Sequence, residues 1–271
     1  MPQPPAHVTL EKAVGETPLQ CLQAYRAQHA ALADLPMCYA GRLDPMASGK
    51  LLILIGDTCK VQHRFHALDK AYTFSRLLGV ASDTHDVLGR LSTDPAPPLV
   101  SSASLRAILQ QCSGRISLPY PHFSAKTVGG KPLHTWTLEG RLDEIEIPVQ
   151  TSTIYALQLT AAQTIARTTA AKLACQKINT LPPVTDSRKA LGQDFRRVAV
   201  LDDWQQLAAD DTLPARYQLF TFQCIASSGT YMRSLASEIA QRLNTVGLAW
   251  HIHRAAIGRY DATTAQWITQ Y

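Results

Sequence analysis

The chain has 271 residues, of which 46% are hydrophobic and 17% are charged, and its net charge is +5. This composition excludes an intrinsically disordered protein and allows a substantial core in one large domain or two modest ones. The longest apolar run is 51–55, far shorter than the roughly 18 residues that a membrane span needs.

Further composition signals concern location and partners. Residues 1–9 hold three prolines and no basic cluster followed by an apolar stretch, so we expect no secretory signal and a cytoplasmic protein. The six cysteines show neither a C-x-x-C spacing nor a paired histidine spacing, which indicates reduced thiols and no zinc site. The positive charge permits a polyanionic partner without requiring one.

The predicted elements mix helices and strands without regular alternation. Thr17 and Pro18 are typical of a helix start, and apolar spacing extends that helix over 17–33. The other predicted elements are strands at 50–55, 72–80, 154–160 and 217–226 and helices at 101–111 and 230–244. This order favours an α+β architecture around a largely antiparallel sheet over a doubly wound parallel sheet.

Two stretches differ from the single helices and strands predicted above. Residues 118–131 contain two prolines and two glycines among polar and basic residues, which predicts a long functional loop. Residues 161–213 begin alanine-rich and end in a basic part, which suggests an inserted helical subdomain or flap. The basic cluster comprises Arg188, Lys189, Arg196 and Arg197.

Asp44 lies in a turn that leads directly into the predicted strand 50–55. Gly41 and Gly49 flank it and Pro45 follows it. A turn aspartate of this kind usually binds its own backbone. The alternative is a nucleophilic carboxylate at the lip of the sheet.

Arg233 lies in the first turn of the predicted helix 230–244. A helix dipole disfavours a cation there by about 0.5 kcal/mol, so something else should stabilise it. A facing carboxylate, joined to it as a bidentate pair, would do so. The alternative is a surface arginine stacked on Tyr231.

Five segments, in this order, resemble the TruB-type pseudouridine synthases, which convert a uridine in the TΨC arm of tRNA. The segments are 12–17, 41–49, 70–89, 124–126 and 228–235. Each is weak or moderate alone, but their common order and spacing make the resemblance specific. The Arg42-Leu43-Asp44 segment also resembles the RluA and RsuA families, whereas the later motifs favour the TruB type.

The resemblance implies an isomerase with the pseudouridine synthase fold, a mostly antiparallel sheet flanked by helices with the active cleft across it. It implies no cofactor and no metal. An aspartate attacks the flipped uridine, the glycosidic bond breaks, and the uracil turns and rejoins through C5. Asp44 matches the nucleophile, Tyr72 the tyrosine that stacks on the target base and can serve in proton removal, and Arg233 the arginine that pairs with the nucleophile.

The resemblance also implies substrate contacts. Ile252 matches the aliphatic residue that supports the uracil, and Tyr39 replaces a histidine that contacts the flipped nucleotide region in the family. Lys126 and Lys131 belong to the loop that closes over RNA and are expected to meet phosphates, with solvated lysines as the alternative. Arg42, in the nucleophile segment, is expected to contact the substrate.

We therefore expect one catalytic domain over 1–271, with 161–213 as a helical, basic insertion. No C-terminal PUA domain is expected, since the chain ends soon after the last motif. The expected partner is structured RNA, above all tRNA with U55 of the T-loop as target, with no membrane or metal partner and a monomeric state. The alternatives are the same chemistry on ribosomal RNA, or a catalytically silent RNA-binding or RNA-folding protein.

Overall fold

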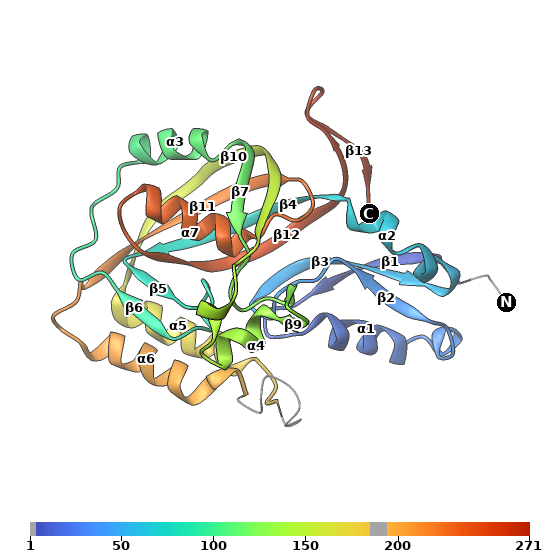
Figure 1. The fold of residues 1–271 in the computed structure, drawn as a ribbon, viewed down its shortest axis with the longest axis horizontal. Coiled ribbons are helices and arrows are strands. Elements are labelled where there is room, and N and C mark those ends of the chain that lie inside the picture. The colour runs from blue at the N-terminus through green and yellow to red at the C-terminus, as the bar shows by residue number, and fades with distance from the viewer. Residues whose placement is uncertain (1–3, 185–193) are drawn as a thin grey trace.

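The centre of the molecule is a nine-stranded sheet, in a computed structural model that describes residues 4–184 and 194–271 (Figure 1). Its strands are β1 (His7–Lys12), β2 (Met37–Ala40), β3 (Ala47–Ile55), β4 (Asp69–Leu78), β7 (Gly114–Pro119), β10 (Val149–Ala166), β11 (Arg216–Ala226), β12 (Gly247–Asp261) and β13 (Gln266–Gln270). The order is β1-β3-β12-β4-β11-β10-β7, with β2 paired to β3 and β13 to β12. Only β3 and β12 pair in parallel among these strands, so the predicted mostly antiparallel α+β architecture is confirmed.

Helices and two small hairpins complete the described part of the chain. The α-helices are α1 (Pro18–Ala27), α2 (His63–His66), α3 (Ser102–Gln111), α4 (Leu133–Leu138), α5 (Arg167–Asn179), α6 (Arg197–Ala209) and α7 (Met232–Arg242), and short 3₁₀ helices lie at Ala30–Leu32, Gly56–Val61, Leu142–Glu144 and Asp194–Arg196. The hairpins pair β5 (Val80–Ser82) with β6 (Leu91–Thr93) and β8 (Thr127–Val128) with β9 (Lys131–Pro132). Within the described ranges, no helix combines the length and the apolar character that crossing a membrane requires.

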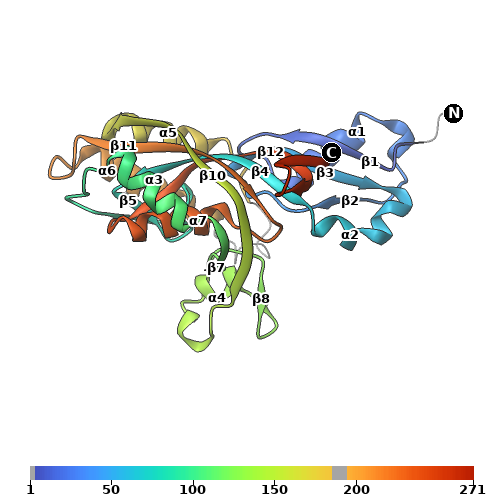
Figure 2. The ribbon, with the colours of Figure 1, turned by 90° about the horizontal axis from the view of Figure 1, so that it is seen from above.

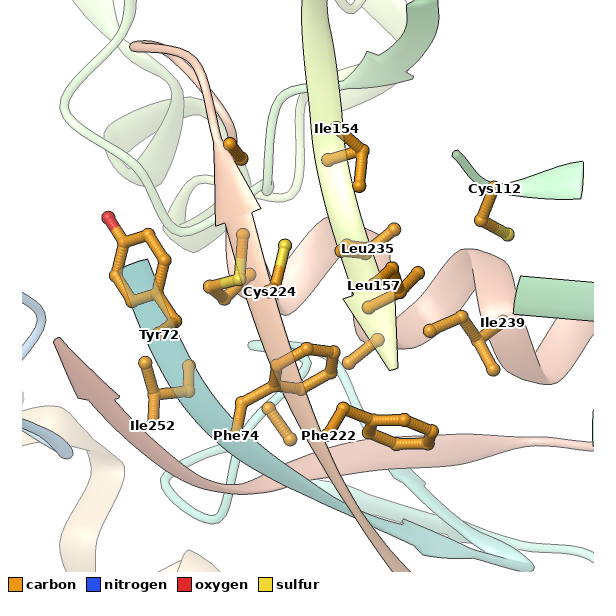
Figure 3. Packing of buried hydrophobic residues seen from close by; sticks show 14 of the residues in the cluster. Tyr72, Phe74, Cys112, Ile154, Leu157, Phe222, Cys224, Leu235, Ile239 and Ile252 are labelled. Carbon is orange, nitrogen blue, oxygen red and sulfur yellow. The ribbon is translucent and has the colours of Figure 1, made fainter. Parts of the chain in front are cut away.

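Both faces of the sheet are buried because its central strands carry apolar side chains on both sides. Phe74 of β4 and Phe222 of β11 share one buried cluster with Leu235 of α7, and their rings lie 5.0 Å apart (Figure 3). Leu219 of β11 belongs to a second cluster with Trp204 of α6. Successive strand residues point to opposite faces, so α3 and α7 cover one face and α5 and α6 the other (Figure 2).

The first helix begins as predicted and ends earlier. The Thr17 hydroxyl accepts a hydrogen bond from the Gln20 amide at 3.2 Å, and the Gln20 side chain accepts one from the Thr17 amide at 2.8 Å. This capping box fixes the start of α1. The predicted helix 17–33 was too long, because the chain leaves the helical conformation at His29, with φ −130° and ψ 85°, and resumes only as a 3₁₀ turn at Ala30–Leu32.

The predicted loop 118–131 is more regular than expected. It contains the end of β7 and all of β8, and together with α4 it projects from the body of the molecule (Figure 2). The Trp136 indole donates to the carbonyl of Val128 at 2.9 Å, and the Leu133 amide donates to that of Lys126 at 2.8 Å. These internal hydrogen bonds give the projection its own small structure.

The segment 161–213 starts inside the sheet. β10 extends beyond the predicted strand 154–160 and pairs with β11 until Ala166 lies opposite Arg216. Helices α5 and α6 follow, and the Trp204 indole donates to the carbonyl of Val87 at 3.0 Å. Arg188 and Lys189 lie outside the described residues. That the segment is an insertion into a single catalytic domain stays a prediction.

Candidate active site

A cavity of about 900 Å³ gathers most of the residues that the sequence indicated. It lies where the turn before β3, the first turn of α7 and the projecting segment come together. Seven of the predicted residues line it: Tyr39, Arg42, Asp44, Tyr72, Lys126, Arg233 and Ile252. The structure does not bring Lys131 there. Its ammonium lies 2.6 Å from the Glu139 carboxylate and 4.5 Å from the centroid of the Trp136 ring.

Strand pairing brings three of these residues to one place. The Ala47 amide donates to the carbonyl of Asp44 at 3.0 Å, which closes the turn before β3. In β12, Ile252 pairs with Ala47 on one side and with Phe74 of β4 on the other. Tyr72 precedes Phe74 by two residues and so lies on the same face. Figure 3 shows Tyr72 beside Ile252, with its hydroxyl pointing away from the packed aromatic rings.

Arg233 and Asp44 form a bidentate pair. Arg233 Nε donates to Asp44 Oδ2 at 2.7 Å, and Nη2 donates to Oδ1 at 3.1 Å. The Arg233 side chain is 5% exposed and that of Asp44 is 41% exposed. The guanidinium is therefore buried while the carboxylate opens into the cavity, and Arg233 is not a surface residue stacked on Tyr231.

Two backbone carbonyls complete the surroundings of Arg233. Nη1 donates to the carbonyl of Thr84 at 2.8 Å, and Nη2 also donates to that of Phe123 at 3.2 Å. These two carbonyls and the Asp44 carboxylate accept hydrogen bonds from all three nitrogens of the planar guanidinium, so the guanidinium has one defined orientation. Its place in the first turn of α7 is stabilised by these partners.

Asp86 is a second carboxylate near Arg233 and was not among the predicted site residues. Its Oδ2 lies 3.9 Å from Arg233 Nε, and its Oδ1 accepts from the Thr84 hydroxyl at 2.7 Å. Burial raises the pKa of Asp86, and Arg233 opposes that shift. Burial also disfavours charge on Arg233, but the carboxylates of Asp44 and Asp86 outweigh it and raise the pKa of the guanidinium. The signal in the sequence was the segment Asp83-Thr84-His85-Asp86, which lies within the matching segment 70–89.

Arg254 is a further residue of the site that was not predicted. It is 1% exposed, and its Nε donates to the carbonyl of Lys50 at 2.7 Å. Its two other nitrogens donate to the carbonyls of Arg42 at 3.2 Å and Gly41 at 3.3 Å. Arg254 thereby holds the backbone just before Asp44. Its position two residues after Ile252 in a strand was the available signal, because such residues share a face.

The cavity is rich in positive charge. Its charged lining comprises Arg42, Asp44, Lys70, Asp86, Lys126, Arg196, Arg233 and Arg254. Burial, with a smaller contribution from Arg254, lowers the pKa of Lys70 to about 8. Burial raises the pKa of Tyr72 against the influence of Arg254, so its hydroxyl keeps its proton at neutral pH. Over residues 4–184 and 194–271, no three His, Cys, Asp or Glu side chains are grouped to hold a metal ion.

Comparisons with known proteins show which sequences and folds this chain is similar to. Residues 33–178 match the family model described as "TruB family pseudouridylate synthase (N terminal domain)". The tRNA pseudouridine synthase B of Caldicellulosiruptor saccharolyticus is 28% identical over 227 residues, which cover 84% of this chain and 60% of that protein. The tRNA pseudouridine synthase B of Lactobacillus delbrueckii subsp. bulgaricus is 26% identical over 263 residues, 96% of this chain and 71% of that one.

The chain thus spans 60% of the length of the first of these relatives. Among solved structures, a chain in the crystal structure of a Cbf5-Nop10-Gar1 complex has a TM-score of 0.54 to this one at 15% sequence identity. The match covers 95% of this chain and 50% of the other. This likeness shows a shared fold.

Proposed function

The chain belongs to the TruB family of pseudouridylate synthases, and on that basis we propose that it isomerises a uridine in structured RNA to pseudouridine. The observation that carries the proposal is the bidentate pair of Arg233 and Asp44 at the wall of the cavity. A nucleophilic carboxylate has to stay ionised near neutral pH, and a guanidinium is always charged there. The buried Arg233 gives Asp44 that companion.

The proposed reaction conserves all atoms of the nucleotide. The Asp44 carboxylate attacks the flipped uridine, and the bond between the ribose and N1 of the uracil breaks. The uracil turns, its C5 forms the new bond to the ribose, and the bond to Asp44 breaks, which frees the carboxylate. C5 then loses its proton and N1 takes one up, which completes an isomerisation that needs no co-reactant.

Tyr72 and Ile252 are the proposed supports of the flipped base. Taking a base out of its stack costs a few kcal/mol, and stacking on an aromatic ring recovers about 1–3 kcal/mol. Tyr72 lines the cavity beside Ile252, so its ring and the aliphatic side chain suit this role. The Tyr72 hydroxyl is further proposed to assist the removal of the C5 proton as a relay, giving its own proton to water while it accepts the one from C5.

We propose tRNA as the substrate, with U55 of the T-loop as the modified position. The cationic lining of the cavity suits a polyanion, and the names of the relatives, tRNA pseudouridine synthase B, support tRNA among RNAs. Arg42, Lys126 and Tyr39 are the proposed contacts to the RNA around the target uridine.

The test uses an unmodified tRNA transcript and chemical mapping of pseudouridine after incubation with the full chain. We expect one new pseudouridine, at position 55, and none in a matched transcript with cytidine there. Binding without product from any tRNA or ribosomal RNA would reject the enzymatic function and leave a silent RNA-binding protein.

Ribosomal RNA is the second candidate substrate. It is favoured by the Arg42-Leu43-Asp44 segment, which resembles the RluA and RsuA families. Competition between tRNA and ribosomal RNA fragments in one reaction separates the two candidates. Modification of the ribosomal fragment alone would replace tRNA by ribosomal RNA in the proposal.

A further inference from the structure

Arg196 connects two segments of the site that are distant in the sequence. Its Nη1 and Nη2 donate to the two carboxylate oxygens of Asp83 at 2.5 and 2.9 Å. Its guanidinium carbon also lies 4.4 Å from the centroid of the Phe123 ring. One side chain from the segment 161–213 thus joins the turn 83–86 to the projecting segment that carries Phe123.

Both of these segments also hold Arg233. Thr84, the residue after Asp83, offers its carbonyl to Arg233 Nη1 at 2.8 Å, and Phe123 offers its carbonyl to Nη2 at 3.2 Å. Each segment that Arg196 contacts therefore contributes one carbonyl that orients the partner of Asp44.

The backbone at Arg196 is itself held in place. Asp194, Phe195 and Arg196 have φ values of 37°, 55° and 55°, a left-handed run that costs about 1 kcal/mol or more per residue unless contacts impose it. Arg197 supplies such contacts, since its Nε donates to Asp194 Oδ2 at 2.9 Å and its Nη1 to the carbonyl of Ile178 at 2.9 Å. Phe195 packs against the second buried cluster.

We propose that Arg196 is a positioning residue for the reaction. It fixes the turn 83–86 against Phe123, and their carbonyls in turn orient Arg233 on Asp44. Arg196 lines the cavity, but the bidentate pair with Asp83 already uses its fork and neutralises its charge, which favours positioning over phosphate binding. The inference rests on the proposed function, because its consequence is the rate of isomerisation.

The test compares Arg196→Met with Arg242→Met. The control removes an arginine in the last turn of α7 whose Nε lies 2.6 Å from the Glu238 carboxylate and which does not line the cavity within the described residues. We expect kcat to fall about tenfold in Arg196→Met with KM within about twofold, since small misplacements of catalytic groups cost large factors in rate. We expect Arg242→Met to keep the kcat of the wild type.

Arg196→Lys extends the comparison and replaces Arg196→Met should that variant not fold. It keeps the charge but loses the planar fork and the stacking on Phe123, so we expect kcat to fall about fivefold. A rise in KM with unchanged kcat would mean that Arg196 binds RNA directly, which overturns the proposal. Wild-type kcat in both Arg196 variants would overturn it as well.

A measurement without RNA separates this inference from the proposed function. In arginine-labelled protein, the NMR signal of the Arg233 Nε–H should shift in Arg196→Met and stay in place in Arg242→Met. If the Arg233 signal shifts in a protein that modifies no RNA, the proposed function is rejected, while the effect of Arg196 on the position of Arg233 stands. An unshifted signal and unchanged kcat in an active enzyme would reject the inference alone.

Discussion

Arg233 and Asp44 lie 189 positions apart in the sequence and meet through hydrogen bonds of 2.7 and 3.1 Å. Their environments differ, because the side chain of Arg233 is 5% exposed and that of Asp44 is 41% exposed. The cation is thus held in the protein interior while the acid remains accessible to a ligand. Changes at Asp44 should therefore affect chemistry far more than folding.

Asp44→Asn should abolish turnover and leave RNA binding nearly unchanged. The amide keeps the shape of the carboxylate but is no nucleophile, so we expect the single-turnover rate to fall by at least about 10³-fold. We expect the free energy of unfolding to fall by about 1 kcal/mol, since Asp44 is partly solvated. Pseudouridine mapping and filter binding measure both effects. Asp57→Asn serves as the control, because Asp57 is 92% exposed and lies in a surface ion pair. If Asp44→Asn has the activity of the wild type, Asp44 is not the nucleophile.

Lys126 and Lys131 should differ in their effect on RNA binding. Lys126 lines the cavity, whereas Lys131 is paired with Glu139 outside it. Each phosphate contact adds about 0.7–0.9 to the slope of log affinity against log salt. Lys126→Gln should lower that slope by about 1, and Lys131→Gln should leave it unchanged. The slopes are measured from the affinity for RNA between about 50 and 200 mM salt. Equal slopes for the two variants would contradict the distinction.

Gly49→Ala should be severely destabilising. At Gly49, φ is +105°, and an added Cβ would lie 2.3 Å from the backbone oxygen of Arg254, where β3 and β12 pair. We expect a loss of at least about 3 kcal/mol in the free energy of unfolding in urea, or no folded protein. Gly56 is the matched control, because its φ is also positive, at +64°, yet no atom lies within 4 Å of an added Cβ. Gly56→Ala should cost only about 1 kcal/mol, and similar losses at both positions would refute the steric explanation.

Because of Lys70, the free energy of unfolding should vary with pH in the alkaline range. Burial lowers its pKa from 10.5 to about 8 in the folded protein, so between these values the unfolded chain binds a proton that the folded protein has released. The free energy of unfolding of the wild type should therefore rise with pH in this interval, by up to about 3 kcal/mol relative to Lys70→Met. Urea unfolding of the wild type and of Lys70→Met is measured from pH 7.5 to 10.5, a range of about three pH units that spans both pKa values. The difference between the two profiles cancels the contributions of the other titrating groups, because both proteins share them. Parallel profiles would show that Lys70 is solvated.

Features that depend on near neighbours in the chain could be predicted from the sequence. Thr17 and Gln20 form their capping box across three positions, and the alternation of Phe220 and Phe222 with polar residues indicated β11. The turn at Asp44 and the helix that starts near Arg233 were located for the same reason. The end of the first helix was not predicted correctly, since α1 gives way to a 3₁₀ turn after His29.

Which of these elements lie side by side depends on contacts between segments that are distant in the sequence. Ile252 lies beside Ala47 because β3 and β12 pair in parallel, in one register that neither strand specifies alone. Sequence spacing likewise left open that Glu139 would engage Lys131 or that Arg254 would hold the backbone before Asp44. The amino-acid sequence by itself determined which residue types were available and most of the local elements that carry them. Only the tertiary structure decided which of them are buried together, because burial and bond geometry arise when distant segments pack.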